Sequence, residues 1–292
     1  GVLAVEEANL LHARSLARAN GWWDPVTSTM QGLHMLYEHT GRGAEWSRLV
    51  EEVVPDFVDS AAEGPLPGRE EHWTLVVGYR VQLAQNARQW GQAERLLGVD
   101  VAWNQQRAAA ILSKPPQTWT ADEKNDVHTL AASVLELSQV QREQGSAKCV
   151  DGCLEAISLA EQIQDYPLAA VCAFDLGHAY KDLPEIRDLA LAEGWYQRSL
   201  GLFAKDDQMG RARCLGQLGS VAYERFLDAR KADRPPEERL GHLSQAEQYY
   251  RQALDIFREV GNRGGEGATL NNIGLVHNAL GQPQAALEHF RQ

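Results

Sequence analysis

An apolar residue followed by glycine recurs at three places in the C-terminal half of the chain, at Gly177, Gly219 and Gly274. Each glycine falls within a run that has apolar residues three and four positions apart, the spacing of one face of an α-helix. Glycine inside a helix costs about 1 kcal/mol relative to alanine. Three such glycines at matching points therefore indicate that another helix packs too close at each of them for a side chain.

A second recurring phrase follows each glycine and combines small and aromatic residues. Its members are Ala192, Tyr196 and Ser199, then Ala246, Tyr250 and Ala253, then Ala286 and Phe290. Spacings of four and three put these residues on one face of a second helix. We expect the aromatic ring to fill space between neighbouring helical hairpins, while the small residues admit the backbone of an adjacent helix.

The same helical spacing covers almost the whole chain, and sustained strand-like alternation is absent. Dipeptides such as Asn20-Gly21 and Thr40-Gly41 mark helix ends. The sequence therefore predicts an all-α fold of hairpin-like helix pairs. The expected helices span residues 4–19, 25–40, 43–58, 70–88, 91–112, 121–144, 147–164, 167–181, 188–204, 207–232, 236–260, 265–280 and 283 onward.

The spacing between hairpins is almost constant, whereas the spacing within them varies. The small residue of one second helix and the glycine of the next first helix are 20 or 21 residues apart: Ala156 to Gly177, Ser199 to Gly219 and Ala253 to Gly274. Within a hairpin, the glycine and the small residue are 22 residues apart in one case and 34 in another. Constant spacing between units indicates a stacked solenoid whose hairpin tips tolerate insertions.

This alternation resembles the tetratricopeptide repeat (TPR), with Leu-Gly and an aromatic residue on the first helix and Ala, Tyr and Ala on the second. The resemblance is strongest over Leu270–Phe290, where Gly281 lies in the turn, and it extends to Leu176–Leu200 and Cys214–Leu254. Leu130–Ala156 also matches, with Ser138 in place of the glycine. A unit nearer about 40 than about 34 residues resembles the long-helix variety of the repeat.

The resemblance implies a right-handed α-α superhelix with the first helices on its concave face. Similar arrays form the C-terminal part of large bacterial signalling proteins, which implies a scaffold or sensor region in the cytoplasm. Residues 1–118 are expected to form degenerate TPR-like hairpins, and residues 119–292 a recognisable array whose last repeat is truncated. The sequence starts without Met and stops within an amphipathic run, so we expect it to be part of a longer protein.

Charge and motifs argue against several classes of function. The chain has 28 Lys and Arg against 40 Asp and Glu, a net charge of −12, so nucleic acid and anionic membranes are poor partners. Phosphate-binding loops and the His-Glu-x-x-His and Gly-x-Ser-x-Gly motifs are absent from the sequence. We therefore expect no enzymatic activity, no cofactor and no metal site, and a protein or peptide as the partner.

Two groups of residues leave alternatives open. Cysteines 149, 153, 172 and 214 lie in helical patterns, where unpaired cysteine usually packs as a small apolar residue, although Cys149 and Cys153 are also spaced as metal ligands. Seven of the eight tryptophans precede residue 120. We interpret them as filling wider gaps between glycine-free hairpins, the alternative being binding anchors. Trp119, in a Pro-rich loop, is expected to be the most exposed.

Candidate binding residues lie on the first helices, near the glycine positions but on the open face. They are Gln82, Gln85, Asn86, Gln139, Arg142, His178, Lys181, Arg213, Ser220, Tyr223, Asn271 and Asn278. Amides hydrogen-bond a peptide backbone, and Arg142, Lys181 and Arg213 suit the carboxylates of an acidic segment. The predicted function is a protein-interaction module that binds a peptide or protein segment on its concave face. The alternatives are self-assembly through an apolar surface at the last hairpin, formed by Leu280, Leu287 and Phe290, or an autoinhibitory arm without an external ligand.

Overall fold

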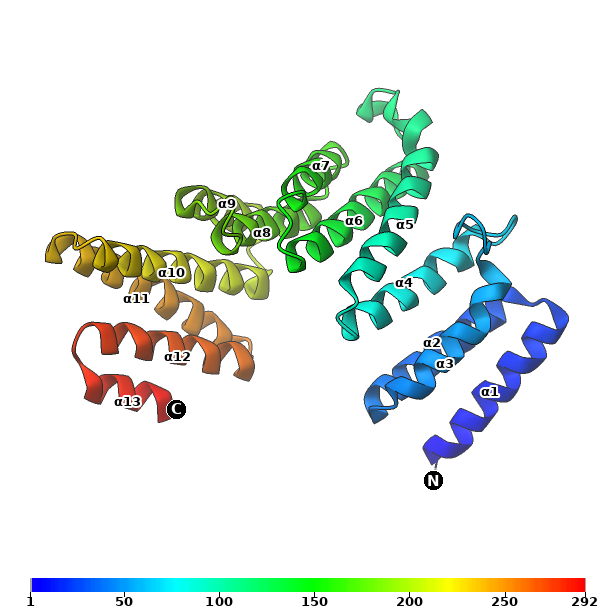
Figure 1. Cartoon of the computed structure of the whole chain (residues 1–292), viewed down its shortest axis with the longest axis horizontal. Coiled ribbons are helices and arrows are strands. Elements are labelled where there is room, and N and C mark those ends of the chain that lie inside the picture. Colours follow the sequence, from blue (N-terminus) through cyan, green and yellow to red (C-terminus); the bar gives the residue numbers. More distant parts are fainter. Residues whose placement is uncertain (1, 292) are drawn as a thin grey trace. The chain divides into compact units, whose positions relative to one another are not determined.

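The computed structural model of the chain describes residues 2–291, and over them it contains thirteen α-helices, one short 3₁₀ turn and no β-strand (Figure 1). Each expected helix is present, with ends within two residues of those predicted, so the all-α prediction is confirmed. The helices are α1 (Val2–Asn20), α2 (Trp23–Thr40), α3 (Gly43–Phe57), α4 (Glu70–Asn86), α5 (Trp90–Leu112), α6 (Ala121–Glu143), α7 (Cys149–Gln162), α8 (Tyr166–Asp182), α9 (Leu189–Leu202), α10 (Gln208–Lys231), α11 (Pro236–Glu259), α12 (Arg263–Ala279) and α13 (Pro283–Arg291).

The chain divides into two compact units, residues 1–110 (unit 1) and residues 111–292 (unit 2). Unit 1 holds α1 to α4 and most of α5, and unit 2 holds α6 to α13. In unit 2, consecutive helices pair as the hairpins α6–α7, α8–α9, α10–α11 and α12–α13. First helices also touch across hairpins, since α6 contacts α8 and α10 contacts α12.

Local sequence explains why these helices begin and end where they do. Thr120 and Glu123 form a reciprocal capping box at the start of α6. Asp or Asn caps four later helices of unit 2 by accepting a backbone hydrogen bond, and such a cap contributes about 1 kcal/mol. These caps are Asp165, Asp188, Asp207 and Asn262. In unit 1, Gly21 and Gly41 follow α1 and α2 with φ of 66° and 68°, where a residue with a side chain is strained.

The repeated glycines lie under aromatic rings of the second helix. A Cβ atom built on Gly177 falls 2.5 Å from Tyr196, one on Gly219 falls 2.7 Å from Tyr250, and Gly274 lies in the same way under Phe290. The prediction that a helix packs too close for a side chain is confirmed. Each ring points from the second helix back onto the first helix of its own hairpin. Tyr196 and Tyr250 also share an apolar cluster with the first helix of the next hairpin, α10 and α12 respectively, as expected.

A second set of rings also joins neighbouring hairpins. Phe203 covers Gly210 at the start of α10, and Phe257 covers Gly265 at the start of α12, each within 2.6 Å of an added Cβ. Both glycines precede the glycine of the repeated phrase by nine residues. Residues of α8, α9 and α10 then share one apolar cluster, and residues of α10, α11 and α12 share the next. The core is therefore continuous along the helices of unit 2.

The first hairpin of unit 2 replaces the glycine and the ring together. Ser138 of α6 stands where later repeats have glycine, and Gly152 of α7 lies against it, so an added Cβ on Gly152 would collide with the Ser138 hydroxyl. Ser138 Oγ donates to the Val134 carbonyl at 2.8 Å. A small residue on the second helix thus compensates for a larger one on the first.

Tryptophans of unit 1 fill space between helices, as expected. Trp73 is fully buried, donates its indole N–H to the Glu63 carbonyl at 3.0 Å and packs edge-on against Trp103. Trp46 is also buried, at 5% exposure. Trp22 is the strongly exposed indole, at 54%.

The prediction that Trp119 is exposed is wrong. Trp119 is 6% exposed. The Pro-rich loop closes into a 3₁₀ turn over residues 116–118, in which the Thr118 N–H donates to the Pro115 carbonyl at 2.9 Å. This turn directs the indole inward, where its large apolar surface leaves water.

All four cysteines are buried and free, which favours the packing interpretation. Burial raises the pKa of each thiol, to about 12 for Cys172 and about 11 for Cys214. Among residues 2–291, no group of three or more His, Cys, Asp or Glu side chains is arranged to hold a metal ion. No helix in the described part of the chain has the length and apolar character needed to cross a membrane.

Candidate functional site

One pocket of unit 2, with a volume of about 210 Å³, is lined by three successive first helices. We call it the unit 2 pocket. Helix α8 contributes Phe174 and His178, α10 contributes Arg213 and Ser220, and α12 contributes Asn272. Phe257 of α11 and the start of α12 complete the wall; the other lining residues are Ala212, Gly216, Gln217, Gly265, Ala268 and Thr269.

Arg213 and Phe174 form the centre of this pocket. The guanidinium carbon of Arg213 lies 5.2 Å from the centroid of the Phe174 ring, and the His178 ring packs edge-on against the same phenyl ring at 4.8 Å. Phe174 is 8% exposed, whereas Arg213 is exposed and forms no ion pair with any described residue. The pocket therefore presents an unneutralised cation over an aromatic floor.

Polar groups surround this cation. Ser220 Oγ donates to the Gly216 carbonyl at 3.2 Å and accepts a hydrogen bond from the Tyr250 hydroxyl at 3.2 Å. The Gln217 side-chain oxygen accepts from Lys181 Nζ at 2.8 Å, which orients its amide group. Asn272 adds a second, half-buried amide. Both amides suit the alternating donors and acceptors of a peptide backbone.

Three of the predicted binding residues instead join hairpins to each other. Gln139 Nε2 and Arg142 Nη1 each donate to a different carboxylate oxygen of Asp175 at 2.7 Å. Asp175 belongs to the next first helix and is 7% exposed. Lys181 likewise reaches from α8 to Gln217 of α10. The sequence assigned Arg142 and Lys181 to carboxylates of a partner, but the structure gives both of them partners within the chain.

Of the other predicted residues of unit 2, His178 lines the pocket, whereas Tyr223, Asn271 and Asn278 lie outside its lining. His178 Nδ1 lies 3.2 Å from Asp182 and keeps its ring at the pocket wall. Tyr223 is half-buried beside Phe226, with ring centroids 5.8 Å apart. Asn271 and Asn278 are exposed on α12.

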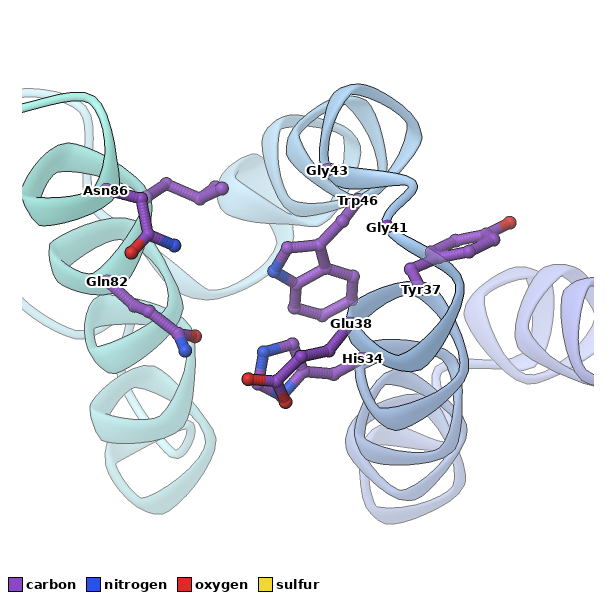
Figure 2. A pocket seen from close by; sticks show the side chains of 9 residues that line it. His34, Tyr37, Glu38, Gly41, Gly43, Trp46, Gln82 and Asn86 are labelled. Carbon is purple, nitrogen blue, oxygen red and sulfur yellow. The ribbon is translucent and has the colours of Figure 1, made fainter. Parts of the chain in front are cut away.

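Gln82 and Asn86 line a separate pocket within unit 1, of about 260 Å³, which we call the unit 1 pocket (Figure 2). Gln85 is half-buried and outside its lining. The opposite wall comes from α2 and α3. This wall was not predicted, because His34 and Glu38 were not among the candidate residues and Trp46 was interpreted as a packing residue. The four-residue spacing of His34 and Glu38, which puts both on one helix face, was the available signal. The full lining is His34, Tyr37, Glu38, Gly41, Gly43, Trp46, Gln82, Leu83 and Asn86.

Comparison with known proteins agrees with this architecture. Residues 237–292, the part of the chain that begins in α11, match the family model of the tetratricopeptide repeat. The C-terminal part of the chain, residues 237–292, therefore carries the tetratricopeptide repeat. In the hairpins α8–α9, α10–α11 and α12–α13, the glycine lies on the first helix and the covering ring on the second.

Solved TPR-like structures are similar at low sequence identity. BtubC (BKLC) from P. vanneervenii is 16% identical, matches over 100% of this chain and 89% of its own, and has a TM-score of 0.55. A kinesin light chain-like protein of Podosopora anserina with nearly identical TPR-like repeats is 15% identical over 74% of this chain and 92% of its own, with a TM-score of 0.48. No curated protein matches the chain. The likeness to BtubC shows the fold, and the TPR family as a whole consists of protein-interaction modules.

Proposed function

We propose that this chain is a protein-interaction module that binds a peptide or protein segment across the first helices of unit 2, with no enzymatic activity of its own. The unit 2 pocket carries this proposal. It crosses α8, α10 and α12, so an extended segment lying in it contacts three consecutive repeats.

Arg213 selects the chemistry of the bound segment. It is exposed, without an ion-pair partner among the described residues, and stacked over Phe174. A guanidinium that already lies over an aromatic ring has less conformational freedom to lose when it binds a carboxylate in two-pronged geometry. We therefore expect an Asp or Glu side chain, or a chain terminus, at this point of the partner. The amides of Gln217 and Asn272 then hold the adjacent peptide backbone.

The wider setting is part of the same proposal. A cytoplasmic scaffold or sensor role in bacterial-type signalling accords with a TPR array, and free, buried cysteines accord with a reducing compartment. The partner then lies either in another protein or in another segment of the same protein, which would make the array an autoinhibitory arm.

A peptide array tests the proposal. Arrays of acidic, neutral and basic 12-residue peptides are probed with the purified chain, and we expect the acidic set to bind best. Arg213→Gln should weaken that binding by about tenfold, because it removes a charged hydrogen-bonding partner. Lys205→Gln is the matched control, since Lys205 is an exposed cation outside the pocket lining. Equal binding by Arg213→Gln and the unaltered chain would overturn the proposal.

Self-assembly is the second candidate function. Leu287 and Phe290 on α13 are 46% and 47% exposed, whereas Leu280 is half-buried. Two large apolar side chains on one short helix favour contact with another apolar surface, including that of a second copy. Sedimentation at increasing protein concentration tests this, with Leu287→Glu as the variant that should remain monomeric. A monomer at all concentrations would exclude self-assembly.

A further inference from the structure

We propose that the unit 1 pocket binds an arginine side chain of a peptide partner. This inference rests on the proposed function, because it adds a basic anchor in unit 1 to the acidic contact proposed for unit 2. The two sites lie in different units and take opposite charges, so each can be tested without the other.

Aromatic rings form one wall of the unit 1 pocket. The ring centroids of His34 and Trp46 are 4.7 Å apart, and Tyr79 lies behind them at 4.8 Å from Trp46 and 5.3 Å from His34. Trp46 and Tyr79 are 5% and 6% exposed, so their rings are fixed by packing. A rigid aromatic wall is a favourable surface for a planar guanidinium, which stacks on rings and carries a weakly held hydration shell.

Two buried donors on these aromatic rings have no hydrogen-bond acceptor. Neither the indole N–H of Trp46 nor the hydroxyl of Tyr79 forms a hydrogen bond. The nitrogen edge of the Trp46 indole faces the side of the pocket where Gln82 and Asn86 lie (Figure 2). A buried donor without an acceptor is destabilising by about 1–3 kcal/mol. A backbone carbonyl of a peptide in this pocket supplies the acceptor that the indole lacks.

Charge favours a cation in the unit 1 pocket. Glu38 is exposed, directs its carboxylate into the pocket and forms no ion pair with any described residue (Figure 2). The pocket also lies at the C-terminal ends of α2 and α4, which carry partial negative charge. The N-terminal end of α3, at Gly43, contributes partial positive charge, so two negative helix ends face one positive end. Arg42, which lies between the lining residues Gly41 and Gly43, is already paired with Glu7 and Glu45 at 2.7 and 3.0 Å. An anionic ligand would meet the free carboxylate of Glu38.

Arginine fits this combination better than lysine does. Its five N–H donors in a plane serve Glu38 in two-pronged geometry while the side-chain oxygens of Gln82 and Asn86 accept the remaining donors. These three groups point into the same pocket from α2 and α4 (Figure 2). An ammonium group supplies only a point charge and cannot stack on the Trp46 wall with the same contact area.

A capped arginine, N-acetyl-arginine-N′-methylamide, is the probe. It supplies one guanidinium and two carbonyls with no other charge. In ¹⁵N-labelled protein, Trp46→Phe identifies the indole signal of Trp46 among those of the eight tryptophans. Titration of the unaltered chain should shift this signal downfield, because the indole N–H gains an acceptor. Capped citrulline, which has the same shape without charge, should leave it in place, and capped lysine should bind more weakly.

Glu38→Gln should weaken capped-arginine binding by about fivefold, the range for an ion pair open to solvent on one side. Glu51→Gln is the matched control, because Glu51 is an exposed carboxylate of the same unit outside the pocket. An unmoved Trp46 signal, or equal binding of capped arginine and capped citrulline, would overturn the inference. If peptides bind in an Arg213-dependent manner while Trp46 does not respond, the inference fails and the proposed function stands. If Trp46 responds to capped arginine but no peptide binding depends on Arg213, the inference stands and the proposed function fails.

Discussion

The ring of Tyr196 lies against the backbone of Gly177, so that a methyl group on residue 177 would fall 2.5 Å from the ring. Tyr196 is fully buried and cannot move aside without disturbing its neighbours. We therefore expect Gly177→Ala to destabilise unit 2 by about 1–3 kcal/mol, as overpacking of a core usually does. Urea denaturation followed by circular dichroism measures this as a lower midpoint.

Gly194→Ala is the matched control for that substitution. Gly194 lies in α9 of the same hairpin, is exposed, and has no atom within 4 Å of an added Cβ. Alanine is a better helix former by about 1 kcal/mol, so this variant should be as stable as the unaltered chain or more stable. Equal midpoints for the two variants would show that the ring does not enforce glycine at residue 177.

Asp175 joins two repeats, because Gln139 and Arg142 of α6 both donate to its carboxylate on α8. Arg142→Met leaves a carboxylate that is 7% exposed with one neutral donor, which should destabilise unit 2 by about 2–3 kcal/mol. Urea denaturation is again the measurement. Combining Arg142→Met with Asp175→Leu removes the stranded charge and should restore part of the loss.

A surface ion pair provides the comparison for this buried one. Arg251 pairs with Glu247 four residues earlier on α11, and its side chain is 59% exposed. Arg251→Met should change the stability by less than about 0.5 kcal/mol. If Arg142→Met were equally harmless, the Asp175 contacts would contribute no more than an ordinary surface pair.

Helices and hairpin pairing were predictable because both depend on residues close in sequence. Apolar spacing fixed the helices, and the glycine phrase located the close contact in each hairpin. The packing of Tyr196 against the next hairpin was predicted, whereas its contact with Gly177 in its own hairpin was not, since only the packing of three helices decides where the ring points. Phe203 and Phe257 were missed for the same reason: their contacts with Gly210 and Gly265 join different hairpins.

The binding surface was harder to predict than the fold. A position on the exposed face of a helix indicates that a side chain can reach a ligand. It does not indicate which residues of other helices pair with that side chain in the folded chain. Arg142 looked available for a ligand until α8 placed Asp175 beside it. Trp46 was interpreted as a packing residue only, because its contacts with His34 and Tyr79 come from two other helices and are not visible in the local sequence.

Acid should weaken unit 1 through Glu7. Hydrogen bonds from Arg42 and Tyr37 hold the pKa of this carboxyl below its ordinary value of 4.5. A carboxyl with a depressed pKa stabilises the folded state fully above its ordinary pKa, and that contribution is lost as the pH falls through the depressed value. The stability difference between the unaltered chain and Glu7→Gln should therefore be constant above about pH 5 and shrink in stronger acid.

Tryptophan fluorescence during urea denaturation at several pH values measures this, since six of the eight indoles lie in residues 1–110. Glu6→Gln is the control, because Glu6 is exposed and forms no ion pair with a described residue. The role of Glu7 would be refuted by a Glu7→Gln difference that persists unchanged at pH 3.

The four cysteines should resist thiol reagents in the folded chain. They are at most 2% exposed, and burial raises the pKa of every thiol, so thiolate is scarce and sheltered. At pH 8 we expect Ellman's reagent to react only as fast as the helices open, and all four thiols to react at once in concentrated guanidinium. Ser158→Cys, at an exposed position of α7, provides a thiol that should react immediately under the same conditions. A rapid reaction of one equivalent in the unaltered folded chain would mean that one of these thiols is accessible, and would reopen a reactive or ligand role for it.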